Sequence, residues 1–387
     1  MKPSRSTPPT LRRTVGRTGR LAVAALALAF GSAGLAACET APPTLTAQTL
    51  VAGLSHPWDL SFTPSGSIIW TERGGRIVRR QANGATNQLA ADLSDLWVSG
   101  ETGLMGVVVD PRFNANRRVY TCQGWTNGSR SDVRVIPWVA NAAGTALARQ
   151  APIVTGMPAS SGRHGGCRLR FDDSGRLYVG TGDATIGTTP QSLTSLGGKV
   201  LRVDPDTGAG VAGNPFASSA DAITRRIWSY GHRNVQGLAI RPADGTLWSA
   251  EHGPDRDDEI NRGQSGNHGW DPVPGYNEDV PMTDTTKFPS ARTAAWSSGV
   301  PTVATSGITW LSGSGWKGWD DRLVVATLKG QSLLIMQPQR NGTVTEIARI
   351  YQGSFGRIRT AQLGPDGLLY LTTSNGSNDR IIRITPS

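Results

Sequence analysis

Short apolar runs separated by turn-forming residues make up most of this chain. The runs are rich in β-branched and aromatic residues and alternate with Gly, Asp, Asn and Pro. Stretches with the spacing of an amphipathic helix are nearly absent. This pattern predicts an all-β protein.

One phrase recurs six times: a turn rich in Pro, Asp and Gly, a short apolar centre, a Thr or Ala, and a polar, Gly-rich exit. The copies are TPSGSIIWTERGG, PRFNANRRVYTCQG, DDSGRLYVGTGD, PADGTLWSAEHG, WDDRLVVATLKG and GPDGLLYLTTSNG. Their centres lie about 46 to 76 residues apart, which leaves room for four short strands in each interval. We therefore predict a six-bladed β-propeller of four-stranded antiparallel blades. A large β-sandwich is the rival fold, but it gives no reason for six copies of one phrase.

Polar side chains leave the repeated strands. In a propeller the innermost strands run toward the axis and their exits open on one mouth, so we expect these side chains to converge there. They are Glu72, Asp183, Glu251, His252 and Lys329. The pattern predicts a functional site at this mouth.

The first 37 residues have the pattern of an export signal. They contain no Asp or Glu, carry six basic residues, and continue through the apolar run LAVAALALAF to Leu35-Ala36-Ala37-Cys38. The apolar run is too short for a permanent membrane span. LAAC resembles the bacterial lipobox, which predicts a signal peptide over 1–37, lipidation of Cys38, a tether over 38–47 and the propeller over 48–387. An ordinary signal peptide with a chance Cys is the alternative.

Removing that segment changes the charge balance. The formal net charge of the whole chain is +10, but without the signal 33 basic residues face 29 acidic ones. We see no Lys/Arg-rich run and no recognition-helix pattern, so nucleic acid is not expected as a partner. We expect membrane contact through the lipid anchor only, and a periplasmic or cell-surface location.

Two cysteines remain beyond the predicted anchor, Cys122 and Cys167. An exported protein with two leftover cysteines often pairs them, so we predict a disulfide between them. Two buried thiols are the alternative.

Five phrases carry a family resemblance. They are GETGLMGVVVDPRF (100–113), GRHGGCRLRF (162–171), YGHRNVQGLA (230–239), EHGPDRDDEIN (251–261), and the pair ATLKG (326–330) with FGRIRT (355–360). Together they resemble the glucose/sorbosone dehydrogenase family, the soluble quinoprotein sugar dehydrogenases. The resemblance implies oxidation of aldose sugars at C1 to lactones, with hydride passed to calcium-bound pyrroloquinoline quinone.

By the same resemblance His164 is the catalytic base. Oxidising a C1 hydroxyl requires removal of its proton, and a neutral imidazole suits this near working pH. Taken alone, a His in a Gly-rich loop is more often structural. Arg163 departs from glucose-active relatives, which tend to have an acid there, so a preference for glucose is not implied.

The resemblance assigns cofactor binding to a cationic set. Arg233 and Asn234 match the pair in GHRN, and a guanidinium such as Arg233 would stabilise negative charge arriving on the quinone during catalysis. Lys329, Arg357 and Arg359 match residues that pair with the cofactor carboxylates. Without the resemblance, Arg357 and Arg359 would be interpreted as one face of a solvated strand.

Substrate and metal positions follow from the same phrases. Glu101 matches a polar side chain at the substrate edge, where glucose-active relatives tend to have an amide. The backbone carbonyls of Gly253 and Pro254 match ligands of the Ca²⁺ ion that also binds the quinone. Asp258 and Glu259 resemble ligands of a second calcium, although the family's NYGW is here NHGW. An acidic cluster without metal is the alternative.

Two other functions are compatible with a propeller, because fold alone does not decide function. A propeller lactonase would build a metal site from Glu, Asn and Asp and need no quinone; the cationic set argues against it. A non-catalytic carbohydrate-binding propeller is the third reading. The chain has no CxxCH haem motif, so a dehydrogenase would need a separate electron acceptor, a periplasmic cytochrome or quinone. It also has no GxGxxG between a strand and a helix, so nicotinamide is not expected.

Overall fold

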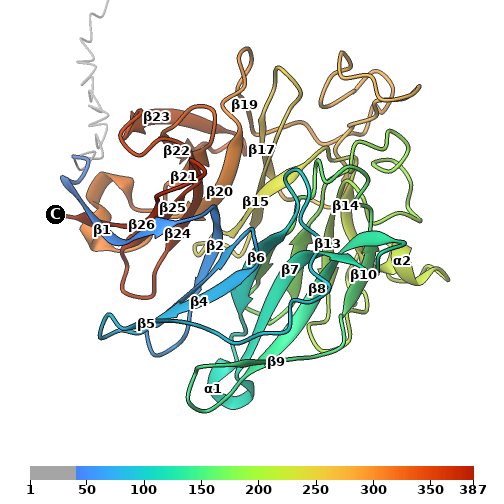
Figure 1. Cartoon of the computed structure of the whole chain (residues 1–387). Coiled ribbons are helices and arrows are strands. Elements are labelled where there is room, and N and C mark those ends of the chain that lie inside the picture. The colour runs from blue at the N-terminus through green and yellow to red at the C-terminus, as the bar shows by residue number, and fades with distance from the viewer. Residues whose placement is uncertain (1–40) are drawn as a thin grey trace, which may run out of the picture. The chain divides into compact units, whose positions relative to one another are not determined.

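The computed structural model describes residues 41–387, so the predicted signal peptide and Cys38 lie outside the described residues. Six sheets follow one another in a ring (Figure 1). Helices are few and short: α1 (Phe113–Asn116), α2 (Ala222–Arg226) and a 3-10 segment at Ser314–Trp319. Within 41–387, no helix has the length and apolarity needed to cross a membrane.

The first three sheets are built outward from their innermost strands. Sheet 1 has the order β2 (Pro57–Phe62), β3 (Ile68–Glu72), β4 (Arg76–Arg80), β5 (Thr86–Gln88). Sheet 2 has the order β6 (Leu104–Val109), β7 (Arg118–Thr126), β8 (Ser131–Ala140), β10 (Val154–Met157), with β9 (Leu147–Arg149) also on β8. Sheet 3 has the order β11 (Arg168–Phe171), β12 (Leu177–Gly180), β13 (Lys199–Val203), β14 (Ile227–Tyr230), β18 (Gly266–Asn267), the last pair being parallel.

The last three sheets repeat the arrangement. Sheet 4 has the order β15 (Val235–Ile240), β16 (Leu247–Glu251), β17 (Glu259–Arg262), β19 (Trp296–Ser297). Sheet 5 has the order β20 (Thr305–Trp310), β21 (Leu323–Thr327), β22 (Leu333–Pro338), β23 (Val344–Ile350). Sheet 6 has the order β24 (Ile358–Leu363), β25 (Leu369–Thr373), β26 (Asp379–Pro386), β1 (Leu45–Leu54).

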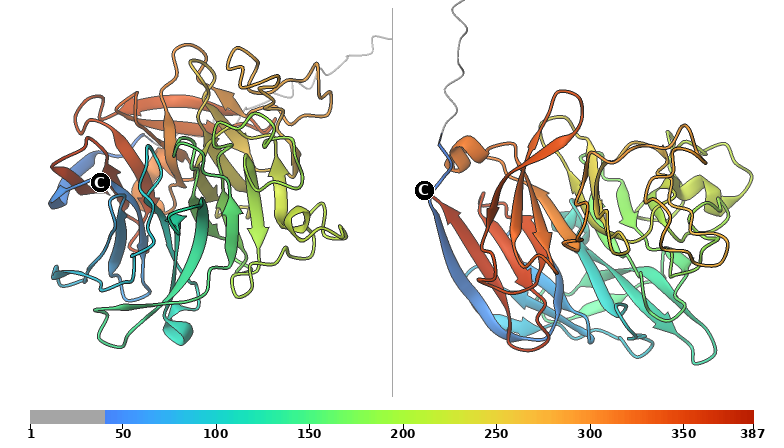
Figure 2. Two further views of the ribbon diagram at one scale, coloured as in Figure 1. Left: turned by 45° about the vertical axis from the view of Figure 1, so that its right-hand side comes forward. Right: turned by 90° about the horizontal axis from the view of Figure 1, so that it is seen from above.

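This architecture confirms the predicted six-bladed propeller. The innermost strands β2, β6, β11, β15, β20 and β24 contact one another in a closed ring, seen from two sides in Figure 2. The prediction was wrong on one detail. The six recurring phrases form the second strands β3, β7, β12, β16, β21 and β25, not the innermost ones. Second strands are covered on both faces by neighbouring sheets, which explains their uniformly apolar centres.

The N-terminal strand completes the last blade. β1 pairs antiparallel with β26, and Leu45 lies opposite Pro386. This pairing closes the ring, because the last sheet combines one strand from the N-terminal end with three strands from the C-terminal end. β1 begins inside the segment 38–47 that the sequence assigned to a tether, so the propeller starts before residue 48.

A buried ion pair lies where the innermost strands meet. Asp59 on β2 and Arg168 on β11 are both fully buried, with Arg168 Nη1 2.5 Å from Asp59 Oδ1. Arg168 also donates from Nε to the Gln236 carbonyl of β15 (2.8 Å) and from Nη1 to the Thr360 hydroxyl of β24 (2.9 Å). One guanidinium therefore connects four of the six innermost strands.

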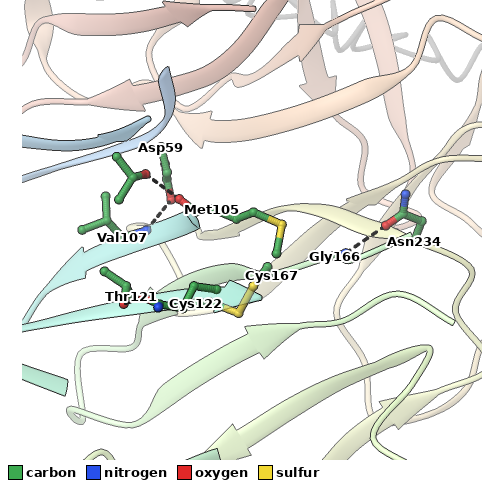
Figure 3. The surroundings of a disulfide bond; sticks show 10 residues. Asp59, Met105, Val107, Thr121, Cys122, Gly166, Cys167 and Asn234 are labelled. Carbon is green, nitrogen blue, oxygen red and sulfur yellow. Dashed lines mark hydrogen bonds between the residues drawn. A yellow bond between two sulfur atoms is a disulfide. The ribbon is translucent and has the colours of Figure 1, made fainter. Parts of the chain in front are cut away.

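Cys122 and Cys167 form a disulfide, shown with its surroundings in Figure 3. Cys122 lies in β7, and Cys167 directly precedes β11. Both are fully buried among apolar residues that belong to sheets 2 and 3. The bond therefore connects two neighbouring blades beside the loop that carries His164.

Removing this bond should destabilise the propeller. The bond encloses a chain segment with a sequence separation of 45, and removing a native disulfide from a loop of that size typically costs about 2–5 kcal/mol. We expect the double variant Cys122→Ala/Cys167→Ala to lose that much free energy of unfolding, measured by denaturant titration. Unchanged stability would contradict this role for the bond.

Candidate functional site

The start of each innermost strand lies beside the end of the second strand of its sheet. Val235 is paired with Glu251, Ile358 with Thr373, and Arg168 with Gly180. Segments that precede innermost strands and segments that follow second strands therefore meet at one end of the propeller. We call it the site end. Each predicted site residue belongs to one of these segments or to the beginning of β17 or β24.

His164 sits in a tightly packed loop before β11. Its backbone has a positive φ of 52°, which is costly for a residue other than Gly, and its N–H donates to Glu101 Oε2 (3.2 Å). The loop packs so closely on the end of β12 that a Cβ at Gly182 would lie 1.8 Å from the His164 carbonyl oxygen. A Cβ at Gly166 would lie 2.4 Å from the Thr181 carbonyl carbon. Glycine at these two positions is what lets the imidazole reach its place.

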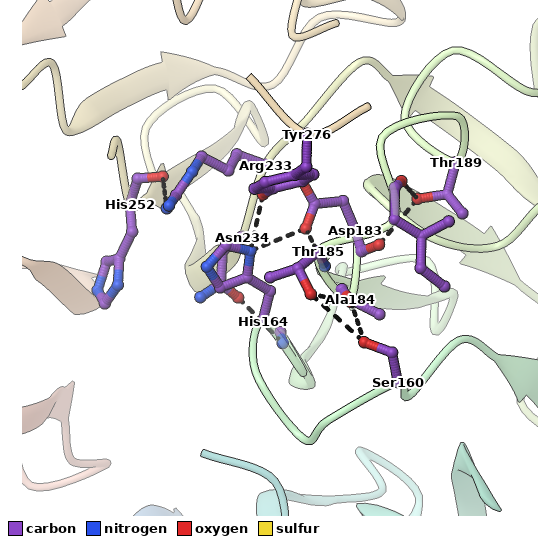
Figure 4. Close-up of polar contacts among 12 residues, drawn as sticks. Ser160, His164, Asp183, Ala184, Thr185, Thr189, Arg233, Asn234, His252 and Tyr276 are labelled. Atoms are coloured by element: carbon purple, nitrogen blue, oxygen red, sulfur yellow. Dashed lines mark hydrogen bonds and ion pairs between the residues drawn. The ribbon is translucent and has the colours of Figure 1, made fainter. Parts of the chain in front are cut away.

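The His164 ring is held by Asp183, which follows β12 (Figure 4). His164 Nδ1 lies 2.8 Å from Asp183 Oδ1, and both side chains are buried. Asp183 also accepts from the Thr185 N–H at Oδ1 (2.8 Å) and from Trp270 Nε1 at Oδ2 (2.9 Å). The carboxylate is therefore fixed in position and holds Nδ1, so Nε2 is the ring nitrogen that this pair leaves unengaged.

A chain of hydrogen bonds links the His164 loop to Arg359. Glu101 Oε2 accepts from Asn234 Nδ2 (3.3 Å), and Asn234 Oδ1 accepts from Gln236 Nε2 (3.0 Å). Gln236 Oε1 in turn accepts from Arg359 Nη1 (2.9 Å). Burial alone would raise the pKa of Glu101, but electrostatic interactions with His164, His252 and Arg359 and the hydrogen bond from the His164 N–H bring it below its usual value.

Lys329, Arg357 and Arg359 have no carboxylate within ion-pair distance among residues 41–387. Arg359 is half-buried, and its buried Nε has no hydrogen-bond partner in that region. Burial, followed by the nearby Arg168, lowers its pKa to about 9. Arg357 is exposed beside it, whereas Lys329 donates to the Thr302 hydroxyl (3.1 Å) and contacts none of the other predicted site residues. An anion bound here would gain charge-assisted hydrogen bonds.

Arg233 is engaged by the protein itself. Its Nη1 donates to the carbonyls of His252 (3.1 Å) and Gly253 (2.9 Å), its Nη2 pairs with Glu278, and its guanidinium lies 5.7 Å from the centre of the Trp270 ring. Its Nε has no partner in the described region. These contacts hold the Arg233 guanidinium against the turn after β16. Glu278 comes from the long loop between β18 and β19.

His252 adds a neutral group to the turn after β16. Burial lowers its pKa to about 4, so the ring is uncharged near neutral pH. Its Nε2 is buried and has no partner within the described chain. Such an atom usually has an unseen partner, either a water or a ligand.

The predicted calcium ligands are largely occupied by protein contacts. The Gly253 carbonyl accepts from Arg233, while no hydrogen bond to the Pro254 carbonyl is found within residues 41–387. Asp258 accepts backbone N–H groups at both oxygens: Gly253 at Oδ1 (3.0 Å), and Val303 and Ala304 at Oδ2. Across residues 41–387, no three or more His, Cys, Asp or Glu side chains gather as a metal cluster. Roles in metal binding remain predictions for these residues.

Glu259 belongs to a buried polar network inside sheet 4. Its oxygens accept from the Thr283 hydroxyl (3.0 Å) and from Asn261 Nδ2 (3.2 Å), and the same Asn261 nitrogen donates to Glu251 (2.8 Å). Glu251 also holds His232 Nδ1 and the Arg233 N–H, both at 2.8 Å. Burial and the charge of Glu251 raise the pKa of Glu259 to about 8.

The structure joins His164, Glu101, Asn234 and Arg359 through one continuous set of hydrogen bonds, and Arg233 lies beside it, since its carbonyl accepts from the Asp183 N–H (2.8 Å). Of the strand-exit residues, Asp183 and His252 belong to the site. Glu72 does not, because it bonds within its own blade. Glu251 supports the site indirectly, because it accepts from the Arg233 N–H. Sequence reasoning gave Asp183 no role and missed Tyr276, whose hydroxyl lies 3.1 Å from His164 Nδ1. No motif marks Tyr276; its loop position was the only signal.

The raised pKa of Glu259 makes stability depend on pH. The folded pKa of about 8 exceeds the ordinary value of 4.5, so the folded state holds an extra proton between these values. The free energy of unfolding should therefore fall as pH rises through this window. Without added metal, Glu259→Gln should reduce the loss between pH 5 and pH 8.5 by on the order of 2 kcal/mol. The control Glu346→Gln, at a half-buried acid that pairs with Arg349 outside the site, should not. Equal slopes for both variants would contradict the assignment.

Comparison with known proteins agrees with this geometry. The sequence model of the Glucose / Sorbosone dehydrogenase family matches residues 54–383. Aldose sugar dehydrogenase YliI of Escherichia coli is 33% identical, with 89% of this chain and 94% of the relative covered. Quinoprotein glucose dehydrogenase B of Acinetobacter calcoaceticus is 29% identical, with 60% and 53% covered.

Solved structures give the same result. The apo-form of the soluble aldose sugar dehydrogenase from Escherichia coli superimposes with a TM-score of 0.80 at 30% identity, covering 89% of this chain and 100% of that one. The PQQ-bound aldose sugar dehydrogenase from Streptomyces coelicolor gives 0.73 at 29% identity, covering 90% and 100%. This chain belongs to the glucose/sorbosone dehydrogenase family.

Proposed function

We propose that this protein oxidises aldose sugars at C1 to lactones, using bound pyrroloquinoline quinone. The observation that carries the proposal is the charge distribution at the site end. Lys329, Arg357 and Arg359 have no carboxylate partner in the described region, and Arg359 is connected to His164 by the hydrogen-bond chain described above. A cofactor with three carboxylates matches such a cationic set. Family membership and the PQQ-bound Streptomyces relative support the same reading.

The residues present suit the cofactor. Three buried polar atoms of site residues have no partner in the described region: Arg359 Nε, Arg233 Nε and His252 Nε2. Lys329, Arg357 and Arg359 would hold the carboxylates, and Arg233 and Asn234 would contact the ring system. When bound, the quinone supplies the acceptor for the hydride that leaves the sugar C1. Asn234 is already fixed through Gly166 and Gln236, so its amide would meet the cofactor without reorganisation.

His164 would perform the proton transfer. With Nδ1 held by Asp183, Nε2 of the neutral ring carries a lone pair and takes the C1 hydroxyl proton. The adjacent carboxylate then stabilises the imidazolium. Glu101 would accept hydrogen bonds from other sugar hydroxyls, since its carboxylate already anchors the His164 backbone.

For calcium we propose only the residues that would hold it, the backbone carbonyls of Gly253 and Pro254. Binding at the Gly253 and Pro254 carbonyls would place the ion beside the Arg233 guanidinium, which already donates to the Gly253 carbonyl. Sugar oxidation measured with and without a chelator tests whether the ion is needed.

We also propose that the chain is exported, lipidated at Cys38 and served by a separate electron acceptor, a periplasmic cytochrome or quinone. The Cys122–Cys167 disulfide suits an oxidising compartment. Fatty-acid labelling of the full chain tests the anchor, with Cys38→Ala as the control.

Reconstitution tests the function. Purified protein is incubated with pyrroloquinoline quinone and Ca²⁺ and then assayed on aldoses with an artificial electron acceptor. Lactone formation that depends on quinone supports the proposal. Lactone hydrolysis without quinone would favour a lactonase, and sugar binding without turnover would favour a binding module.

In the reconstituted enzyme, His164→Ala should lower kcat by about 10²–10⁴, the usual contribution of a general base. Cofactor affinity, measured by fluorescence titration, should stay near that of the wild type because the cationic set is untouched. A variant with full activity would remove His164 from the mechanism.

Arg357→Ala should instead weaken cofactor affinity by about 1.5–3 kcal/mol, the value of a hydrogen bond to a charged group. The matched control is Arg349→Ala, because Arg349 pairs with Glu346 on β23, outside the site. Equal affinities for both variants would show that Arg357 does not contact the cofactor.

A further inference from the structure

The loop between β18 and β19 places one side chain directly on the predicted base. Tyr276 lies in this loop, and its hydroxyl is 2.8 Å from Asp183 Oδ2 and 3.1 Å from His164 Nδ1 (Figure 4). Its ring centre is 6.2 Å from that of His164 and 6.3 Å from that of Trp270. The phenol therefore bridges both members of the His–Asp pair.

Counting hydrogens fixes the direction of these bonds. An ionised carboxylate only accepts, so the single phenolic hydrogen of Tyr276 is donated to Asp183. The phenolic oxygen can then only accept from His164 Nδ1. Asp183 Oδ1 also lies 2.8 Å from that nitrogen, so Nδ1 faces two acceptors. Both contacts require the ring proton on Nδ1, which leaves Nε2 unprotonated in the neutral ring.

The rest of the site keeps Asp183 in this arrangement. Trp270 Nε1 shares Oδ2 with the tyrosine, and the Thr185 N–H shares Oδ1 with the histidine. Each carboxylate oxygen thus accepts from two donors. Burial, followed by the charge of Asp183, raises the pKa of Tyr276, so the phenol keeps its proton.

We propose that Tyr276 is a positioning residue for His164, whose hydroxyl, shared between the imidazole and Asp183, fixes the ring with Nδ1 protonated and Nε2 directed to the substrate. This inference rests on the proposed role of His164 as the base. Nothing in the sequence motifs points to Tyr276, because it reaches the site from a loop outside all five phrases.

Tyr276→Phe tests the proposal, because it removes the hydroxyl and keeps the ring packing. In the reconstituted enzyme we expect kcat to fall about tenfold, with KM for the sugar unchanged within twofold. The acid limb of the kcat profile should shift relative to the wild type, because the variant loses both a donor to Asp183 and an acceptor for the Nδ1 proton. The titratable groups in contact with His164 are Asp183, Tyr276 and Glu101.

A second readout needs neither cofactor nor turnover. In the cofactor-free protein, proton and ¹⁵N NMR of the His164 ring should show a protected Nδ1–H and an unprotonated Nε2, with assignment from His164→Ala. In Tyr276→Phe the Nδ1 proton should exchange with water at least tenfold faster. This arm remains valid even if the protein oxidises no sugar, so a failed function and a failed positioning role are distinguishable.

The matched control is Tyr370→Phe, which removes a tyrosine hydrogen bond to Asp366 (2.7 Å) in sheet 6, away from the site. It should leave kcat, the pH profile and the His164 signals unchanged. The proposal is overturned if Tyr276→Phe behaves like this control. It is also overturned if KM rises while kcat stays constant, since that would make Tyr276 a substrate contact.

Discussion

The ion pair between Asp59 and Arg168 is the constraint from which the site geometry follows. Both groups are fully buried, and together with Gln236 and Thr360 they connect the innermost strands of four sheets. Breaking such a pair would leave an uncompensated charge in the interior, so the innermost strands cannot shift independently. The Gln236 side chain also accepts from Arg359, so Gln236 contacts both the buried Arg168 and Arg359.

Charge is divided across the site end. The side with His164 carries the carboxylates of Asp183 and Glu101, each held by several donors. Lys329, Arg357 and Arg359 have no carboxylate partner in the described chain, and His252 is neutral near neutral pH. The first group is suited to accept and stabilise a proton, and the second to bind a polyanion. A redox reaction that separates a proton from a hydride needs this division.

The repeated phrase was enough to predict six blades, because each copy forms a strand packed between sheets. It did not identify the innermost strands, because two of them carry buried charged residues, Asp59 in β2 and Arg168 and Arg170 in β11. These two strands show no continuous apolar run, so pattern reasoning assigned the central position to the second strands. Strand boundaries at the N-terminus were missed for a related reason: β1 is an exposed outer strand with little apolar signal.

Motif reasoning placed His164, Glu101, Asn234 and Arg359 at one site, since each lies in or beside a recognisable phrase. It could not find Tyr276 or Glu278, which reach the site from a long loop whose path depends on tertiary packing. Nor could it foresee that Arg233 donates a hydrogen bond to the Gly253 carbonyl, which is a predicted calcium ligand. The two residues lie in different phrases, and neither phrase alone indicates this contact.

A crystal structure of the protein soaked with pyrroloquinoline quinone tests the central claim most directly. The account predicts the cofactor carboxylates on Arg357, Arg359 and Lys329, with the quinone oxygens facing His164 Nε2. A quinone bound elsewhere, or bound at the site end with its carboxylates away from these three cations, would contradict it.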